Sequence, residues 1–323
     1  MTLTRSVIGL AAGALLSVSG LAAHAEDKQL YIIGVFHADV SNSFSSVVKK
    51  GVEQAGKDLN VKVEFVGPDK FDVVQEGQLI EAAIAKKPDG LFVSLADCDA
   101  LKPMVQQAID AGIPVMSFNS GASCFKKVGS LVHVAEDGVE AGKGAGERLV
   151  ALGAKNVICL NHEVGNAILE DRCNGIKAAV EKAGGKVTVV PTSLADPSVT
   201  KGAIEAAFLK DPTIDAIGGE WGGGPSPAVI DQTLTDLNLQ GKVIVSYFDP
   251  GLDTLALIKE GKIAFETSQV PFNQGYLPVE FLAAYLRYGV LPGGPTGVVS
   301  NGGFFIDKTN VDKITDLVKS GIY

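Results

Sequence analysis

The feature of this sequence that most constrains its fold is an internal repeat. Three short stretches recur later in the chain with similar residue types: residues 51–55 resemble 175–179, residues 63–66 resemble 187–190, and residues 80–84 resemble 204–208. Each pair is separated by the same 124 residues (175 − 51, 187 − 63 and 204 − 80). Three matches in one register predict two lobes of the same design, which would leave a cleft between them.

The hydrophobic pattern indicates how each lobe is built. Apolar runs rich in Val, Ile and Phe predict strands at 30–36, 61–66, 90–95, 113–118, 156–161, 186–190, 216–219, 242–248 and 263–267. Helical runs separate them; residues 43–59 carry apolar side chains at three- and four-residue steps, with Asn42 as the expected N-cap. Strands that are apolar on both faces and alternate with helices predict the α/β class, with two doubly wound parallel-sheet lobes.

The first 25 residues have the pattern of a secretory signal peptide. Arg5 precedes an apolar run over 7–21, and Ala23 and Ala25 supply the small residues of a cleavage site. A membrane anchor is the alternative, but the run is shorter than the roughly 20 residues that span a bilayer and is diluted by Gly and Ser. We therefore expect cleavage after Ala25 and a mature protein in the periplasm.

Charge and histidine placement exclude several functions. The chain has 28 Lys and Arg against 37 Asp and Glu, with no basic run, which argues against nucleic acid as a partner. His37, His133 and His162 lack metal-ligand spacing. The glycines at 142–146 lie within a helical run, which favours close helix packing over a phosphate loop. His162 and Glu163 suit acid–base work, but no nucleophile accompanies them. We expect no enzyme activity, catalytic residue, metal or cofactor.

Four cysteines follow the predicted signal peptide and allow three pairings. Cys98 and Cys124 follow consecutive strands, whose loops meet if those strands are neighbours in a parallel sheet. This favours a Cys98–Cys124 disulfide. Cys159 ends a strand and Cys173 lies in the helix that packs back on it, so Cys159–Cys173 is the complementary pair. Disulfides persist in the periplasm, and oxidised cysteines are not nucleophiles.

Polar side chains gather at the predicted carboxyl ends of the strands, where ligands bind in open α/β sheets. The candidate ligand-binding residues are Asn42, Asn119, Asn166, Arg172, Glu220, Asp249 and Gln269, with Phe44 and Trp221 as aromatic neighbours. Carboxylates accept from hydroxyls, Arg donates, and a flat ring covers a C–H face, so the set suits a neutral polyhydroxylated ligand.

Four of these residues have other interpretations. Asn42 and Asp249 could serve as helix caps, and Arg172 could pair with Glu170 or Asp171 at the surface. Trp221 could belong to the core. As cleft groups rather than core groups, Arg172 and Asp249 are expected to be replaceable with little effect on the melting of the unliganded protein.

Several motifs together resemble one family, the type I periplasmic sugar-binding proteins similar to ribose-binding protein. They are Ser-Asn-Ser-Phe at 41–44, Gly-Ile-Pro-Val at 112–115 with Asn119, Glu-Asp-Arg-Cys-Asn-Gly at 170–175, Val-Ser-Tyr-Phe-Asp at 245–249 and Thr-Ser-Gln at 267–269. The resemblance covers nearly the whole chain after the signal peptide. The family's proline and second aromatic are replaced by Ser43 and Ser45, so another pentose, a hexose or a linear polyol fits as well as ribose.

The resemblance implies an architecture and a partner. A hinge of three segments, near 133–137, 269–271 and 292–299, would join a first lobe (26–133 and 271–296) to a second lobe (134–270 and 297–323). The protein would be a monomer that binds a sugar or polyol by hinge closure and delivers it to an ABC permease in the inner membrane. The alternative is a chemoreceptor or signalling protein that binds a nucleoside or an autoinducer-like molecule on the same scaffold.

Overall fold

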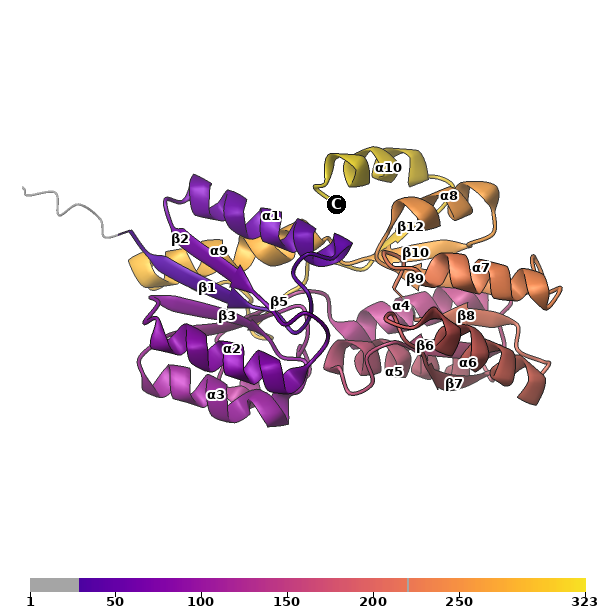
Figure 1. Ribbon diagram of the computed structural model, residues 1–323, viewed down its shortest axis with the longest axis horizontal. Helices are drawn as coiled ribbons and strands as arrows, with labels where there is room; N and C mark the ends of the chain where they lie inside the picture. Colours follow the sequence, from indigo (N-terminus) through magenta and orange to yellow (C-terminus); the bar gives the residue numbers. More distant parts are fainter. Residues whose placement is uncertain (1–28, 220) are drawn as a thin grey trace, which may run out of the picture.

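The computed structural model describes residues 29–219 and 221–323; the predicted signal peptide at 1–25 lies outside the described residues. The chain forms two α/β lobes side by side (Figure 1). Each lobe contains a six-stranded sheet, with strand order β11-β5-β4-β3-β1-β2 in the first lobe and β12-β10-β9-β8-β6-β7 in the second. The predicted fold class, two similar doubly wound parallel-sheet lobes, is confirmed.

The first lobe is built mostly from the N-terminal part of the chain. Its elements are β1 (Tyr31–Val35), α1 (Ser43–Asp58), β2 (Lys62–Val66), α2 (Val73–Ala85), β3 (Gly90–Ser94), α3 (Cys98–Asp110), β4 (Val115–Phe118), η1 (Phe125–Val128), β5 (His133–Val134), α9 (Pro271–Tyr288) and β11 (Val298–Val299). Apolar side chains of α1 and α9 cover one face of the sheet, and those of α2 and α3 cover the other.

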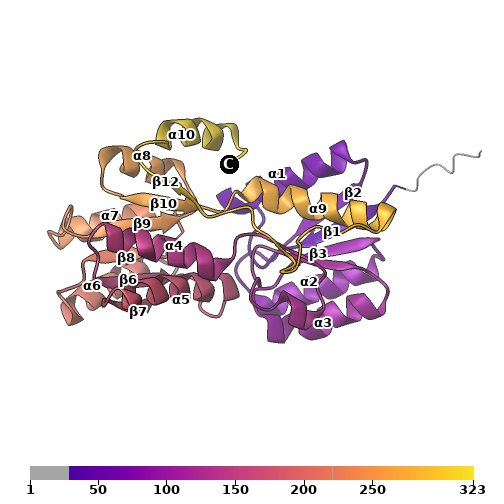
Figure 2. The same ribbon diagram turned by 180° about the vertical axis from the view of Figure 1, so that it is seen from behind.

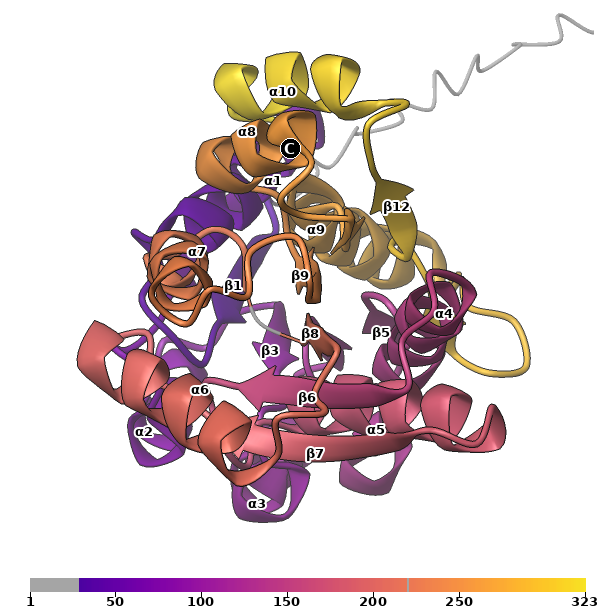
Figure 3. The same ribbon diagram turned by 90° about the vertical axis from the view of Figure 1, so that its right-hand side faces the viewer.

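The second lobe repeats this plan. Its elements are α4 (Gly138–Ala151), β6 (Asn156–Asn161), α5 (Ala167–Lys182), β7 (Lys186–Pro191), α6 (Pro197–Lys210), β8 (Ala216–Gly218), α7 (Ser226–Asp236), β9 (Ile244–Phe248), α8 (Leu252–Glu260), β10 (Phe265–Ser268), β12 (Phe304–Ile306) and α10 (Val311–Ser320). Viewed along the long axis, α6, α7 and α8 lie on one side of the sheet and α4 and α5 on the other (Figure 3).

All nine predicted strands are present, each beginning at most two residues later than expected. The sequence did not predict β5, β11 and β12, which have two, two and three residues. So short a strand shows no periodicity, and these three exist only because their neighbours pair with them. The helix expected at 43–59 is α1, and the Asn42 side chain caps it by accepting from the Ser45 backbone N–H at 2.8 Å.

The strand pairing corrects the expected lobe boundaries. Val298 and Val299 pair with His133 and Val134 in the first sheet, so the chain leaves the first lobe after 299 rather than after 296. Val134 likewise belongs to the first sheet and not to the second lobe. The three crossings therefore follow β5, β10 and β11, and two of them run close together, because Asn301 donates to the Val270 carbonyl and the Gly303 N–H donates to Ser268 (Figure 2).

Glycines let two pairs of helices approach very closely. A Cβ on Gly275 of α9 would lie 1.9 Å from the Val48 carbonyl oxygen of α1, and one on Gly142 of α4 would lie 2.1 Å from the Arg172 carbonyl oxygen of α5. The two contacts are equivalent, because Val48 and Arg172 differ by the repeat offset of 124 (172 − 48). The helix-packing interpretation of the glycines at 142–146 is thus confirmed.

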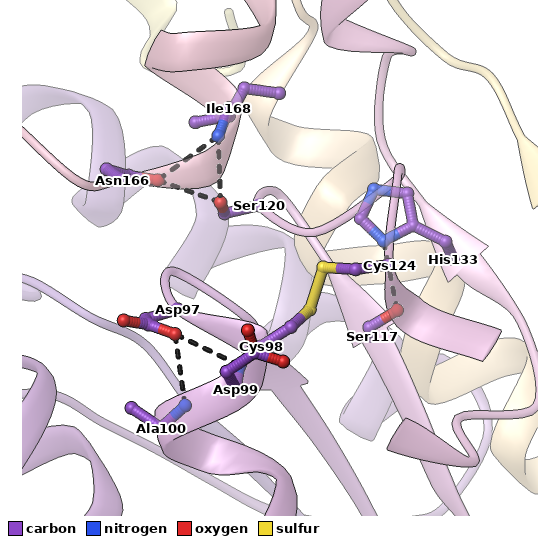
Figure 4. Close-up of a disulfide and its surroundings, with 10 residues drawn as sticks. All are labelled: Asp97, Cys98, Asp99, Ala100, Ser117, Ser120, Cys124, His133, Asn166 and Ile168. Atoms are coloured by element: carbon purple, nitrogen blue, oxygen red, sulfur yellow. Dashed lines mark hydrogen bonds between the residues drawn. A yellow bond between two sulfur atoms is a disulfide. The ribbon is translucent and has the colours of Figure 1, made fainter. Parts of the chain in front are cut away.

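Both favoured disulfides are present, one in each lobe. Cys98–Cys124 joins the start of α3 to the loop after β4, and Cys159–Cys173 joins β6 to α5 within the core. The first pair links the segment that carries Ala96 to the loop that carries Ser120, which lies near the disulfide in Figure 4. Within the described residues, none of the helices has both the length and the apolar character needed to cross a bilayer.

Candidate ligand site between the lobes

A cavity lined by residues of both lobes lies between them, at the carboxyl ends of the strands. Eight of the nine candidate residues line it: Asn42, Phe44, Asn119, Asn166, Arg172, Trp221, Asp249 and Gln269. The ninth, Glu220, lies outside the described residues. The structure therefore brings together side chains that are more than 200 residues apart in the sequence.

Asn119 and Asp249 occupy equivalent places at the ends of β4 and β9. Both have a left-handed backbone, with φ of 58° and 62°, a conformation that Asn and Asp tolerate better than most residues. Both residues are at least 95% buried. One lobe therefore presents an amide to the cavity at the strand end where the other presents a carboxylate.

A hydrogen-bond chain across the second crossing orients Asp249. Gln274 of α9 donates to the Gln269 Oε1 at 2.8 Å, and Asn119 donates to the Gln274 Oε1 at 3.0 Å. With its oxygen engaged, the Gln269 amide nitrogen donates to Asp249 Oδ2 at 2.7 Å. Asp249 Oδ1 is buried without a hydrogen-bond partner among the described residues, so it can accept from a ligand. Burial raises the pKa of Asp249, against the opposing effect of Arg172.

Arg172 reaches the cavity from α5 and forms a buried ion pair with Glu136. Its Nε and Nη2 lie 2.7 and 2.6 Å from Oε1 of Glu136, and its guanidinium stands 4.2 Å from the centre of the Phe248 ring. The side chains of Arg172 and Glu136 are 3% and 1% exposed. The partner of Arg172 is therefore Glu136 and neither Glu170 nor Asp171.

This pair also corrects the expectation that Arg172 is dispensable for stability. Removing Arg172 leaves Glu136 buried and uncompensated, which is strongly destabilising. Sequence reasoning missed Glu136, although it lies in the expected first crossing; nothing in the local pattern indicates which helix a crossing residue contacts.

A second polar cluster joins the lobes at the cavity wall. His37, which follows β1, has Nδ1 2.5 Å from Ser94 Oγ and Nε2 3.3 Å from Asn166 Nδ2. Asn166 also donates to Glu163 Oε2 at 2.7 Å, and Glu163 Oε2 lies 3.6 Å from His37 Nε2. Burial lowers the pKa of His37. His37, His162 and Glu163 line the cavity but were not among the predicted site residues.

Asn166 is both a helix cap and a lobe contact. Its Oδ1 accepts from the Ile168 N–H in α5 and from Ser120 Oγ in the first lobe, at 3.3 and 2.8 Å (Figure 4). The Ala167 N–H donates to the Ala96 carbonyl oxygen at 2.9 Å. The start of α5 therefore docks on the loops that Cys98–Cys124 ties together, and the lobes touch on this side of the cavity.

Aromatic side chains cover two walls. Phe44 stacks on Phe36 with ring centres 6.2 Å apart. A Cβ on Gly223 or Gly224 would come within 3.0 Å of the Trp221 ring, so these glycines let the loop wrap the indole. Ser43 Oγ donates to the Gly223 carbonyl oxygen across the lobes at 3.0 Å. Trp221 is half-buried beside the cavity, and not a core residue.

The described residues contain no group of three or more His, Cys, Asp or Glu side chains arranged to hold a metal ion. The arrangement instead offers hydrogen-bond acceptors, a guanidinium and aromatic faces in one cavity between the lobes.

Comparison with known proteins gives one consistent result. The periplasmic binding protein domain matches residues 33–289. The ribose import binding protein RbsB of Bacillus subtilis is 28% identical over 260 residues, which cover 79% of this chain and 81% of that protein. The xylose/arabinose-binding protein XylF of Sulfolobus acidocaldarius is 25% identical over 259 residues, 76% of this chain but 63% of that protein.

Among solved structures, a carbohydrate transporter from Acidothermus cellulolyticus 11B in complex with myo-inositol superposes with a TM-score of 0.83. It is 30% identical, and the match covers 91% of this chain and 100% of that one.

Proposed function

Because this chain belongs to the periplasmic binding protein family, we propose that it is the substrate-binding component of an ABC importer and holds a monosaccharide or sugar alcohol between its lobes. The observation that carries the proposal is Asp249 Oδ1, a buried acceptor without a partner among the described residues that faces a cavity lined by both lobes. A ligand hydroxyl satisfies such an atom, and an empty site leaves it unsatisfied.

The other cavity groups suit the same ligand class. Arg172 Nη1 stands 4.0 Å from Asp249 Oδ2, so one hydroxyl can bridge the guanidinium and the carboxylate. Phe44 and Trp221 supply flat faces for C–H groups. Two relatives are named for ribose and for xylose and arabinose, and the structural neighbour holds myo-inositol, which also supports a polyhydroxylated ligand.

The proposed mechanism is binding without chemistry. A ligand that contacts both lobes adds interaction energy to the closed form alone and so shifts the population towards it. The closed form of a monomer in the periplasm would then be recognised by a permease in the inner membrane. Export by the signal peptide at 1–25 would place the protein there.

Calorimetry with a panel of pentoses, hexoses, inositols, linear polyols and nucleosides tests this function. A ligand at 100 times its Kd is expected to raise the free energy of unfolding by about 2.7 kcal/mol. Asp249→Asn is expected to weaken binding at least about a hundredfold, since it loses an acceptor and a charge. Asp253→Asn, an exposed change four residues away, is the control. Stabilisation by nucleosides alone, or turnover of any compound, would contradict the proposal.

A further inference from the structure

The acidic side chains that line the cavity differ in whether a basic side chain lies near them. Among the described lining residues the charged side chains are Glu163, Arg172 and Asp249, with His37 and His162 as the titratable neighbours. Arg172 is already neutralised by Glu136 from behind. Both Arg172 and His162 act electrostatically on Asp249 and lower its pKa against the effect of burial. Among the described residues, no Lys or Arg side chain lies within ion-pair distance of Glu163, whose titratable neighbour is His37.

His37 does not supply the missing charge. Asn166 Nδ2 is a donor, and it lies 3.3 Å from His37 Nε2, so that nitrogen is an acceptor and the ring proton sits on Nδ1, facing Ser94 Oγ. The ring is therefore neutral, and its Nε2 lone pair lies 3.6 Å from Glu163 Oε2. Two acceptors thus stand close together at this end of the cavity.

Within residues 29–219 and 221–323, the donors at hydrogen-bond distance from Glu163 are neutral. Asn166 donates to Oε2 at 2.7 Å, and the Glu163 N–H is used by the Asn161 side chain. The Glu163 side chain is 14% exposed, and a ligand in the cavity covers what remains. Burying an unpaired carboxylate is costly, and a hydroxyl offers one hydrogen bond without compensating the charge.

An ammonium group meets both requirements, because it carries the opposite charge and three donors. From this we infer that the ligand is an amino sugar or an aminated polyol, whose protonated amine sits at Glu163 and whose hydroxyls reach Asp249 and Arg172. The inference rests on the proposed function, since it concerns the same cavity, and it narrows the ligand class.

The test compares ligands that differ by one group. Calorimetry is run on D-glucose with 2-amino-2-deoxy-D-glucose, D-allose with 3-amino-3-deoxy-D-allose, and myo-inositol with amino-deoxy inositols. At least one amine is expected to bind about tenfold or more tightly than its hydroxyl parent, equivalent to about 1.4 kcal/mol. In Glu163→Gln, which keeps an oxygen for Asn166, this ratio is expected to fall to about one. Glu140→Gln removes an exposed charge of the same lobe and should leave the ratio unchanged.

The outcomes separate the two claims. Binding of neutral sugars with no preference for any amine overturns the inference and leaves the proposed function standing. An amine preference that survives Glu163→Gln overturns the assignment to Glu163. If no sugar, polyol or amine binds, the proposed function itself fails.

Discussion

The two lobes share a backbone plan but divide the chemistry of the site between them. On the equivalent helices α1 and α5, Val48 of the first lobe corresponds to Arg172 of the second. At the equivalent strand ends, Asn119 corresponds to Asp249. Below the cavity the first lobe has a cluster of Phe36, Phe65, Phe92 and Phe118 in ring contact, whereas the second has the Glu136–Arg172 pair.

The comparison of Val48 with Arg172 indicates that helix and strand packing alone do not require a charged side chain at this position. Val48 is fully buried and packs well where its counterpart is an ion pair. A buried pair is weak evidence of stabilisation, so the charges of the second lobe are explained better by the ligand site than by the fold.

The largest expected effect comes from breaking the ion pair of the second lobe. Arg172→Ala should lower the free energy of unfolding by about 3–5 kcal/mol, because Glu136 is left buried and unpaired. Val48→Ala should cost about 2 kcal/mol through lost apolar contact. Urea unfolding at pH 7 and pH 4 distinguishes the loss of charge compensation from the loss of apolar contact. At pH 4, protonation of Glu136 should reduce the destabilisation caused by Arg172→Ala, whereas the destabilisation caused by Val48→Ala should be unchanged. If the destabilisation of both variants changed equally between pH 7 and pH 4, the role of the Glu136 charge would be contradicted.

The next effect tests whether the lobes are equivalent in packing. Gly275→Ala and Gly142→Ala should each cost about 1–3 kcal/mol, since the new methyl group meets a backbone carbonyl of the neighbouring helix. Gly202 of α6 has nothing within 4 Å of its Cβ position, so Gly202→Ala should stabilise by about 0.5–1 kcal/mol. Thermal unfolding of the three variants measures these changes in stability. If only one of Gly275→Ala and Gly142→Ala were destabilising, the two helix contacts would not be equivalent.

Each lobe also contains a fully buried glutamate that should make stability fall with rising pH. Glu76 of the first lobe and Glu266 of the second are fully buried, and burial raises the pKa of each well above its ordinary value. Between the ordinary and the raised pKa the folded protein keeps a proton that the unfolded chain has lost. Stability therefore falls across that window by up to about 1.4 kcal/mol per pH unit for each group.

The Gln variants check this pH dependence. Glu76→Gln and Glu266→Gln should each flatten the plot of unfolding free energy against pH from 5 upward, measured by urea unfolding. A slope that both variants leave intact would rule out these groups as its source.

The smallest expected effect concerns the crossings. Asp137, before α4, caps its helix with an ordinary φ of −77°, whereas Val270, before α9, has φ of 49° and no side-chain cap. A β-branched residue is strained in this conformation. Val270→Gly should stabilise this arrangement of the lobes by about 1 kcal/mol and tighten ligand binding several-fold. If calorimetry shows the same ligand affinity for Val270→Gly as for the unchanged protein, the backbone of Val270 is equally strained in the open and closed forms.

Much of the fold was predictable because its signals are local. Apolar runs located nine strands, and Asn42 indicated the start of α1. The Cys98–Cys124 disulfide was favoured by the order of strands, because consecutive parallel strands place their loops together, and Cys159–Cys173 was the complementary pair. Eight candidate residues reached one cavity for the same reason: each follows or faces the carboxyl end of a strand.

The missed residues are those whose partners lie on distant elements. Glu136, Gln274 and His37 have ordinary neighbours in the sequence, and their contacts with Arg172, Gln269 and Glu163 arise only when crossings and lobes come together. The lobe boundary at 299 was missed likewise, since a two-residue strand is defined by its partner.

The amino-acid sequence was enough to predict a duplicated α/β architecture and the strand ends where a ligand would bind, and to favour one disulfide pairing, because hydrophobic period, caps and repeats act over a few residues of backbone. Which charges are paired and which face the cavity became known from the folded chain, because electrostatic compensation depends on distances between groups that the chain brings together from separate elements and both lobes.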